Sequence, residues 1–331
     1  MNCKANEAMT KRILSISSAI AMVAILSIGQ IDAAYAAEAS AKTTAAKKTP
    51  IQKAFATPDE LFQALAEAAK SNDLKALVAL LGAQGDALVN SGDVVRDKQR
   101  AESFAASYAD KHSIGMDGDA KATLVVGKDG WPMPIPAVKG ARGWTLDTNA
   151  GAREILARRI GQNEIDTIQV AMAIVDAERD YASEDREADG LREYTSKFVS
   201  SPGKKDGLYW PAKEGEPASP LGPLAAEAAA EGYKGKQGEP TPFHGYYYRL
   251  LTAQGKDAPG GARSYLAHGR MIGGFALVAY PAIYGNSGIM TFIVNNDGVV
   301  YEKDLGPNTA ALAKAMKSYN PDSTWKKAPI K

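Results

Sequence analysis

The spacing of apolar residues predicts helices at the start of the ordered chain. A threonine, a proline and two acids at 57–60 form the pattern of a helix N-terminus. From Leu61 onward, apolar residues recur at intervals of three and four, which gives this helix a buried face. A second helix is predicted after Asp73 and a third over residues 98–111.

The pattern then changes to one typical of strands. Residues 122–126 are β-branched and apolar, and residues 143–146 are short and aromatic. Residues 131–138 alternate but contain three prolines, which confine that strand to an edge or a bulge. We therefore expect residues 54–150 to form a module of helices and an antiparallel sheet.

A long helix is predicted next, over residues 151–181, with Gly161 as a candidate break. Apolar residues between 165 and 175 recur at three and four residues, so the helix is amphipathic and should pack on another element. Isolated carboxylates on such helices, Glu164 among them, are predicted to be solvated.

The remainder of the second module, residues 151–331, is predicted to be mostly strand after a long loop rich in glycine and proline at 201–223. A short alanine-rich helix, four strands and a final helix are predicted over residues 223–231, 245–252, 271–280, 289–294, 299–303 and 309–319. A tight hairpin turn at 296–298, which ends in a glycine, is predicted to join the last two strands. The expected fold class is α+β, with the long helix packed on an antiparallel sheet.

The first residues have the pattern of a bacterial secretory signal peptide, over residues 1–36. A basic pair at 11–12 precedes an apolar run at 13–28, and an Ala-Tyr-Ala sequence ends at Ala36, where cleavage is expected. The run is shorter than the roughly 20 residues of a membrane-spanning helix, and no second stretch is long enough. We therefore expect a periplasmic or secreted mature chain with no membrane span, beginning with a disordered linker at 37–53.

Cleavage would also change the composition. The only cysteine, Cys3, would be lost, so the mature chain would have no disulfide, no cysteine nucleophile and no thiolate metal site. The full chain has 39 basic and 38 acidic residues, and residues 1–36 contain three and two of them, which leaves 36 of each. A neutral chain is not expected to bind nucleic acid or an anionic membrane through bulk charge.

Five segments carry a resemblance to a known family. They read LVVGKDGWP from Leu124, DGLYWP from Asp206, HGYYYRLLTA from His244, GRMIGGFALVAYP from Gly269 and TFIVNNDGVVY from Thr291. Together they resemble the uncharacterised exported bacterial family of domain of unknown function 2950. The resemblance covers nearly the whole mature chain and implies no known activity.

Two further resemblances concern shape. The long helix, the strands rich in glycine and tyrosine and the hairpin at 296–298 are similar to the globular domains of type IV pilins, although the prepilin N-terminus that drives filament assembly is missing. Residues 54–150, with two helices and a closing strand, resemble the NTF2-like fold. That resemblance implies a pocket between the helices and a curved sheet, but fold alone does not give function.

One acidic segment has the spacing of a calcium-binding loop. Acids at alternate positions from 185, with a glycine at the sixth position, match the start of such a loop. The candidate ligands are Asp185, Glu187, Asp189 and Glu193. The bidentate glutamate expected at the twelfth position is Ser196, so a solvated turn is the competing interpretation. No other cofactor is expected.

His244, Tyr246 and Arg249 are the candidate catalytic residues, because a base, a phenol and a cation follow one another at the start of a strand. In the competing interpretation, the tyrosines pack on both faces of the sheet and His244 caps a loop. No serine nucleophile motif accompanies them.

Exposed aromatic residues are the candidate ligand-binding groups. Tyr209 and Trp210 of the long loop, with Trp131 and Trp144 of the first module, are suited to stacking on sugars, peptides or a partner surface. They are equally suited to closing the interface between the modules.

Three function classes follow from the sequence. The leading hypothesis is a non-enzymatic protein of the envelope or extracellular space that binds a ligand or a protein partner. The alternative is an enzyme acting on an envelope polymer, with a polar centre near His244 and Arg249. The third is a pilin-like assembly component, which would keep its N-terminal helix.

Overall fold

The computed structural model describes residues 52–186, 189–213, 215–234 and 240–329, and all of these residues belong to one compact unit. The expected signal peptide and nearly all of the expected linker lie outside the described residues. Gln52, which the sequence placed in the linker, donates hydrogen bonds from Nε2 to Leu80 O (3.1 Å) and Leu146 O (3.0 Å). Ordered contacts therefore begin before the predicted boundary at residue 53.

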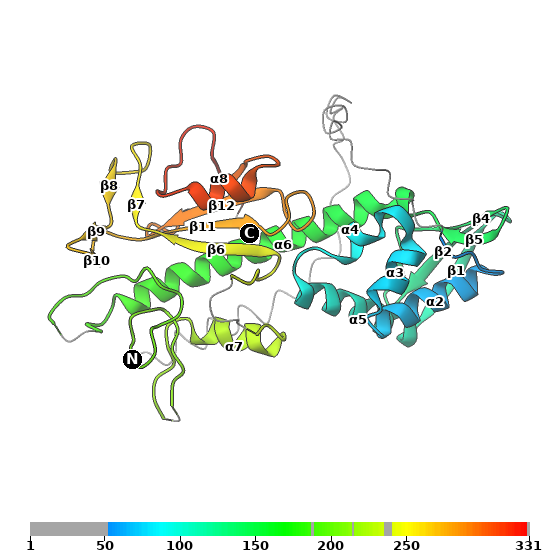
Figure 1. Ribbon diagram of the computed structural model, residues 1–331, viewed down its shortest axis with the longest axis horizontal. Helices are drawn as coiled ribbons and strands as arrows, with labels where there is room; N and C mark the ends of the chain where they lie inside the picture. Colours follow the sequence, from blue (N-terminus) through cyan, green and yellow to red (C-terminus); the bar gives the residue numbers. More distant parts are fainter. Residues whose placement is uncertain (1–51, 187–188, 214, 235–239, 330–331) are drawn as a thin grey trace. The chain divides into compact units, whose positions relative to one another are not determined.

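The first half of the described chain combines short helices with an antiparallel sheet (Figure 1). The helices are α2 (Pro58–Lys70), α3 (Leu74–Leu81), the 3₁₀ helix η1 (Gly82–Gln84), α4 (Gly85–Val89) and α5 (Val94–Asp110). The strands are β1 (His112–Asp117), β2 (Lys121–Val126), β3 (Trp131–Pro132), β4 (Ala137–Gly140) and β5 (Gly143–Leu146). The sheet order is β1-β2-β4-β5, and β3 pairs with β2.

Side-chain caps fix the starts of these helices. Thr57 and Asp73 cap α2 and α3 as predicted, each accepting a hydrogen bond from the backbone N–H three residues later, at 3.2 and 3.0 Å. Helix α5 begins at Val94 and not near residue 98, because Asp93 caps it in the same way. The sequence analysis missed this cap, helix α4 and strand β1.

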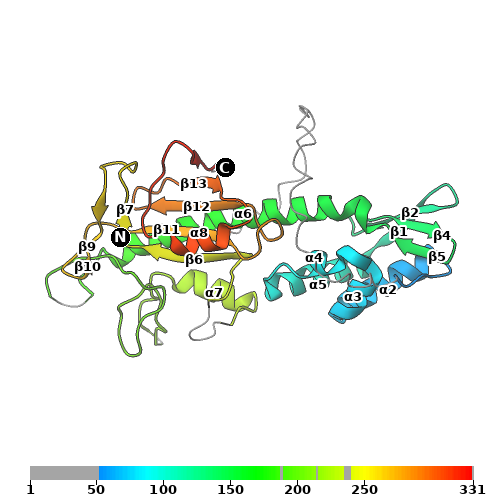
Figure 2. The same ribbon diagram turned by 45° about the horizontal axis from the view of Figure 1, so that its top comes forward.

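The second half consists of the long helix α6 (Thr148–Tyr181), the shorter α7 (Gly222–Ala230) and α8 (Thr309–Ala315), and a larger antiparallel sheet. Its strands are β6 (Tyr246–Leu251), β11 (Ala276–Pro281), β12 (Met290–Asn295), β13 (Tyr301–Asp304) and β14 (Lys326–Lys327), in the order β14-β13-β12-β11-β6 (Figure 2). Two small two-stranded sheets pair β7 (Ala253–Gln254) with β8 (Arg263–Ser264), and β9 (Leu266–Ala267) with β10 (Arg270–Met271). The predicted α+β class with antiparallel sheets is confirmed.

Two apolar clusters form the core. One lies among α2, α3, α5 and the first sheet, and the other lies around the large sheet, whose strand β11 is buried along its whole length. Both α6 and α8 contact β11, so side chains on both faces of that strand are covered. Helix α6 contributes Ala152 to the first cluster and Ile174 to the second. The predicted division into two modules at residue 150 stays a prediction.

Helix α6 departs from its sequence-based description in two ways. It is continuous through Gly161, and Ile165, placed on the packing face, is 48% exposed. The buried face carries four polar side chains among its apolar ones: Arg159, Asn163, Thr167 and Glu178. Glu164 is not simply solvated either, because its Oε1 accepts hydrogen bonds from Ile289 N and Met290 N, both at 2.9 Å. No described helix is both long and apolar enough to cross a membrane.

Glu178 makes the stability of this fold depend on pH. The side chain is fully buried; its Oε2 accepts a hydrogen bond from Thr195 N (3.1 Å), and its Oε1 has no partner among the described residues. Burial raises the pKa of Glu178 from 4.5 to about 8. The native protein therefore keeps a proton that the unfolded chain releases, and this costs stability as the pH rises from 4.5 to about 8.

Replacing Glu178 with glutamine should remove this pH dependence, because the glutamine amide is neutral and has no proton to release in either the folded or the unfolded state. The free energy of unfolding of Glu178→Gln should exceed that of the wild type at pH 8 by a few kcal/mol, at about 1.4 kcal/mol per pKa unit. Urea unfolding between pH 4 and 9 measures this, with Asp176→Asn, an exposed carboxylate on the same helix, as the control. A variant whose stability falls with pH as steeply as that of the wild type would contradict the assignment.

Candidate functional site

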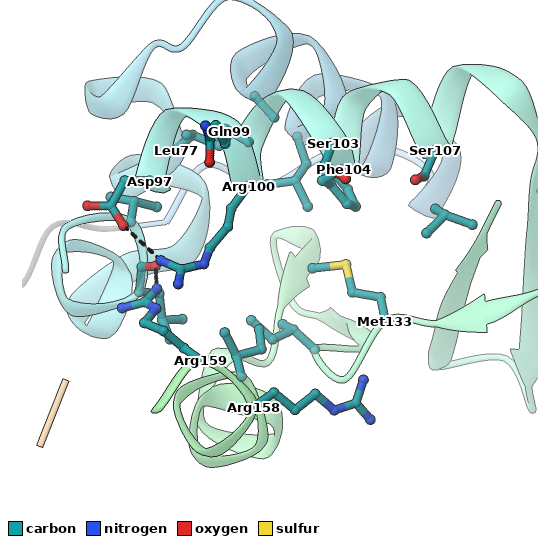
Figure 3. Close-up of a pocket in the computed structure, with 18 of the residues that line it drawn as sticks. Leu77, Asp97, Gln99, Arg100, Ser103, Phe104, Ser107, Met133, Arg158 and Arg159 are labelled. Carbon is teal, nitrogen blue, oxygen red and sulfur yellow. Dashed lines mark hydrogen bonds and ion pairs between the residues drawn. The ribbon is translucent and has the colours of Figure 1, made fainter. Parts of the chain in front are cut away.

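A cavity of about 800 Å³ lies between α5, α6 and strands of the first sheet (Figure 3). Its wall is largely apolar, and includes Leu65, Leu77, Phe104, Met133, Ile135 and Ile155. Pockets that bind small molecules have volumes of roughly 300–1,000 Å³, mostly apolar walls and a few placed polar groups. The size and the lining of this cavity fit that description.

The two helices present regularly spaced residues to the cavity. On α5 these residues recur at three and four positions, and they are Arg96, Gln99, Arg100, Ser103, Phe104 and Ser107. On α6 the same spacing gives Ile155, Arg158, Arg159 and Gln162. Because such residues share one face of a helix, the cavity is lined by two helix faces that each combine apolar and cationic side chains.

The buried end of the cavity is polar. Figure 3 shows the side chains of Arg100, Arg159 and Asp97 gathered there. Arg100 donates from Nη2 to Asn163 Oδ1 (2.8 Å) and lies 3.4 Å from Asp97 Oδ1 through Nη1. Asp97 Oδ2 also accepts a hydrogen bond from Ser91 N (2.8 Å). Burial raises the pKa of Asp97 and lowers that of Arg100.

Arg159 is the most enclosed of the lining arginines, with 6% of its surface exposed. It donates hydrogen bonds to Ala87 O (3.1 Å), to Leu88 O and to Asn286 Oδ1. It forms no ion pair within the described parts of the chain. Burial and the charge of Arg100 lower the pKa of Arg159 to about 10, and Asp97 offsets part of the effect.

Trp131 and Arg158 are partly exposed residues of the cavity lining. Trp131 is 39% exposed, and the side chain of Arg158 is 50% exposed. The guanidinium carbon of Arg158 lies 5.3 Å from the centre of the Trp131 ring, within the range of a cation–π contact. Trp131 is therefore placed at the rim of a cavity, whereas the sequence analysis predicted only that it is exposed.

His244 lies in a separate buried network that adjoins the polar end of the cavity. Its Nε2 is 3.0 Å from Glu231 Oε2, and its Nδ1 is 3.6 Å from Asp166 Oδ2. Asp166 also pairs with Arg96, which lines the cavity. His244 itself is 9% exposed and does not line the cavity. The ring therefore lies between two carboxylates and forms a hydrogen bond with Glu231, whereas its Nδ1 has no hydrogen-bond partner in the described structure.

Asp93 connects this network to helix α5. Its side chain is 1% exposed, and its Oδ2 accepts hydrogen bonds from Tyr233 OH and Gly245 N, both at 2.8 Å. Burial raises the pKa of Tyr233, so its hydroxyl stays a donor. Gly245 has φ +79°, and a Cβ at this position would collide with Asn163, so only glycine fits where β6 approaches α6.

The other two candidate catalytic residues are not brought to His244. Tyr246 OH donates to Met290 O (3.0 Å), whereas Arg249 donates from Nη2 to Ala313 O (2.7 Å) at the end of α8. Successive side chains of a strand point to opposite faces, so residues 246 and 249 face opposite sides of β6. The predicted polar centre of His244, Tyr246 and Arg249 does not form.

The predicted calcium ligands have other partners. Asp185 accepts hydrogen bonds from Asp189 N (3.3 Å) and Gly190 N (2.7 Å). Asp189 forms an ion pair with Arg270, and so does Glu193 through Oε1, at 2.7 Å. Glu187 lies outside the described residues. Nowhere in the described chain do three histidine, cysteine or acidic side chains gather as metal ligands would.

The exposure predicted for two tryptophans is wrong. Trp210 is 6% exposed and belongs to the core around the large sheet, and Trp144 is 4% exposed. The loop that contains Tyr209 is paired by backbone hydrogen bonds with the segment before it. Tyr209 N donates to Phe198 O, and Ser200 N donates to Tyr209 O, both at 2.8 Å. This pairing leaves Tyr209 half-buried and turns the side chain of Trp210 into the core.

Comparisons with known proteins identify a family but no activity. The family model described as protein of unknown function (DUF2950) matches residues 52–328. No curated protein matches the chain. No solved structure matches it either, so the pilin-like and NTF2-like shapes stay predictions.

Removing the Asp93 carboxylate should destabilise the protein, because buried donors would lose their acceptor and α5 its cap. Asp93→Ala should lower the free energy of unfolding by roughly 2–5 kcal/mol. Tyr233→Phe, which removes one of these donors, should cost about 1 kcal/mol. Urea unfolding compares both with Asp86→Ala, an exposed acid on α4. An Asp93→Ala protein as stable as the Asp86→Ala control would show that the network contributes little.

Proposed function

The chain belongs to the DUF2950 family of proteins of unknown function, and we propose that it is an exported, non-enzymatic protein that binds a small, largely apolar molecule in its cavity. The observation that carries this proposal is the cavity of about 800 Å³ between α5, α6 and the first sheet. Its apolar wall favours the burial of an apolar ligand. A pocket at this place is also what the NTF2-like resemblance of residues 54–150 implies.

The polar groups of the cavity favour binding over catalysis. They are arginines, amides, two serines and two aspartates, of which Asp97 is engaged by Ser91 N and Arg100. No histidine or cysteine lines the cavity, and neither serine forms a hydrogen bond with a lining carboxylate in the described structure. His244, the candidate base, is held by Glu231 and Asp166 outside the lining.

Binding in the cavity can be tested with the neutral fluorescent dye 1-N-phenylnaphthylamine. We expect the wild-type protein to enhance its fluorescence with saturation. Ala101 lies on the cavity face of α5, so Ala101→Trp should fill the space and weaken dye binding at least tenfold. Ala106→Trp, on the exposed face of the same helix, is the matched control and should bind like the wild type. Equal dye binding by the two variants would place the dye elsewhere and refute the proposal.

Export can be tested independently of the ligand. The signal-peptide pattern of residues 1–36 supports a mature chain that begins at Ala37 and works in the periplasm or outside the cell. N-terminal sequencing of the natural protein after cell fractionation should find this start in a soluble fraction. Recovery of an uncleaved chain from the membrane fraction would reject export by cleavage and favour the pilin-like alternative.

A further inference from the structure

We propose that the ligand carries an anionic head, which binds between Arg100 and Arg159 at the buried end of the cavity. This inference rests on the proposed function, since it names the chemical class of the molecule that the cavity holds. The apolar part of the ligand would then lie along Leu77, Phe104 and Met133, toward the rim at Trp131.

The charges that line the cavity are unbalanced. Four arginines line it, at positions 96, 100, 158 and 159, against two aspartates, Asp97 and Asp129, of which Asp129 is exposed. Arg96 has its own counter-ion in Asp166, and Arg158 pairs with Glu154 near the rim. Of the lining carboxylates, Asp97 alone interacts with Arg100 and Arg159, and Asp93, which lies outside the lining, adds a second negative charge near Arg100.

Two buried donors are also unused. The Nε atoms of Arg96 and Arg159 are buried without a hydrogen-bond partner in the described structure, and both residues line the cavity. An unpartnered buried N–H is costly, and the cost is greater on a charged group. The two residues belong to α5 and α6, the helices that line the cavity.

The guanidinium of Arg100 is oriented in advance. Asn163 accepts from Arg100 through Oδ1 and is itself held by the bond from its Nδ2 to Ser287 O (2.8 Å). A guanidinium fixed in this way presents a planar set of donors that suits the two oxygens of a carboxylate or a phosphate. A cationic head would add a third positive charge here, and a neutral head would form no ion pair with either arginine.

The test compares ligands that differ only in the head. Calorimetry measures the affinity of the wild-type protein for decanoate, decyl phosphate, decan-1-ol and decyltrimethylammonium, all below their micellar concentrations. The comparison separates the contribution of the ligand's apolar tail from that of its head. We expect decanoate or decyl phosphate to bind at least tenfold more tightly than decan-1-ol, and decyltrimethylammonium to bind weakest. The two anions distinguish a carboxylate from a phosphate ligand. Equal binding of all four heads, or tighter binding of the cation, would overturn the inference.

Variants locate the head. Arg100→Gln should weaken decanoate binding about tenfold and leave decan-1-ol binding within threefold of the wild type. Arg153→Gln removes an exposed charge from α6 outside the cavity and should change neither. Arg159→Gln is the second variant, checked for folding by circular dichroism, because Arg159 also holds Ala87 O and Leu88 O. Equal losses for decanoate and decan-1-ol in Arg100→Gln would mean a change of shape and would count against the anion site.

The outcomes separate the two proposals. Dye binding that is blocked by Ala101→Trp, together with no preference among heads, would leave the binding function standing and remove the anionic ligand. Absence of binding for the dye and for all four decyl compounds would remove both.

Discussion

Burying polar side chains along α6 is the constraint on which the rest of this structure depends. A buried polar atom without a partner costs free energy, so each one on the inner face of the helix requires a donor or an acceptor from elsewhere in the chain. Asn163 accepts from Arg100 on α5 and donates to Ser287 O, which precedes β12. Arg159 reaches Leu88 O at the end of α4 and Asn286 Oδ1 before β12. Segments from both halves of the described chain are therefore held to one helix by hydrogen bonds as well as by apolar packing.

The cavity follows from the same arrangement. Arg100 and Asn163 fix the approach of α5 to α6 at one end, while apolar side chains line the space between the helices without filling it. Apolar side chains that stay in contact with water contribute less stability than buried ones. A ligand that covers the apolar wall of this cavity of about 800 Å³ would therefore stabilise the protein, as does any molecule that binds the native state alone.

Local chemistry made much of the fold predictable from the sequence. Thr57 and Asp73 start helices wherever the following residues can be helical, and the positive φ of Gly298 suits the turn predicted after β12. The long helix and most of its apolar stripe were found, since Val175 is buried and Ile168 and Met172 pack against the core, but its continuity and its buried polar residues were not. Glycine within a helix costs only about 1 kcal/mol, so packing overrides Gly161. A search for apolar periodicity also cannot recognise a face that buries asparagine, threonine and arginine.

The site was less predictable, because residues that are close in the sequence need not meet in the structure. Residues that are far apart in the sequence can also be in contact. Tyr246 and Arg249 stand three residues apart, yet β6 turns them to opposite faces, so a polar cluster in the sequence became no centre in the structure. Arg100 and Asn163 are 63 positions apart and form a hydrogen bond. The recurrence of arginine at 96 and 100 was a readable sign that one face of α5 is cationic. That this face meets a second cationic face across an apolar cavity depends on tertiary packing, which the pattern of a single helix does not contain.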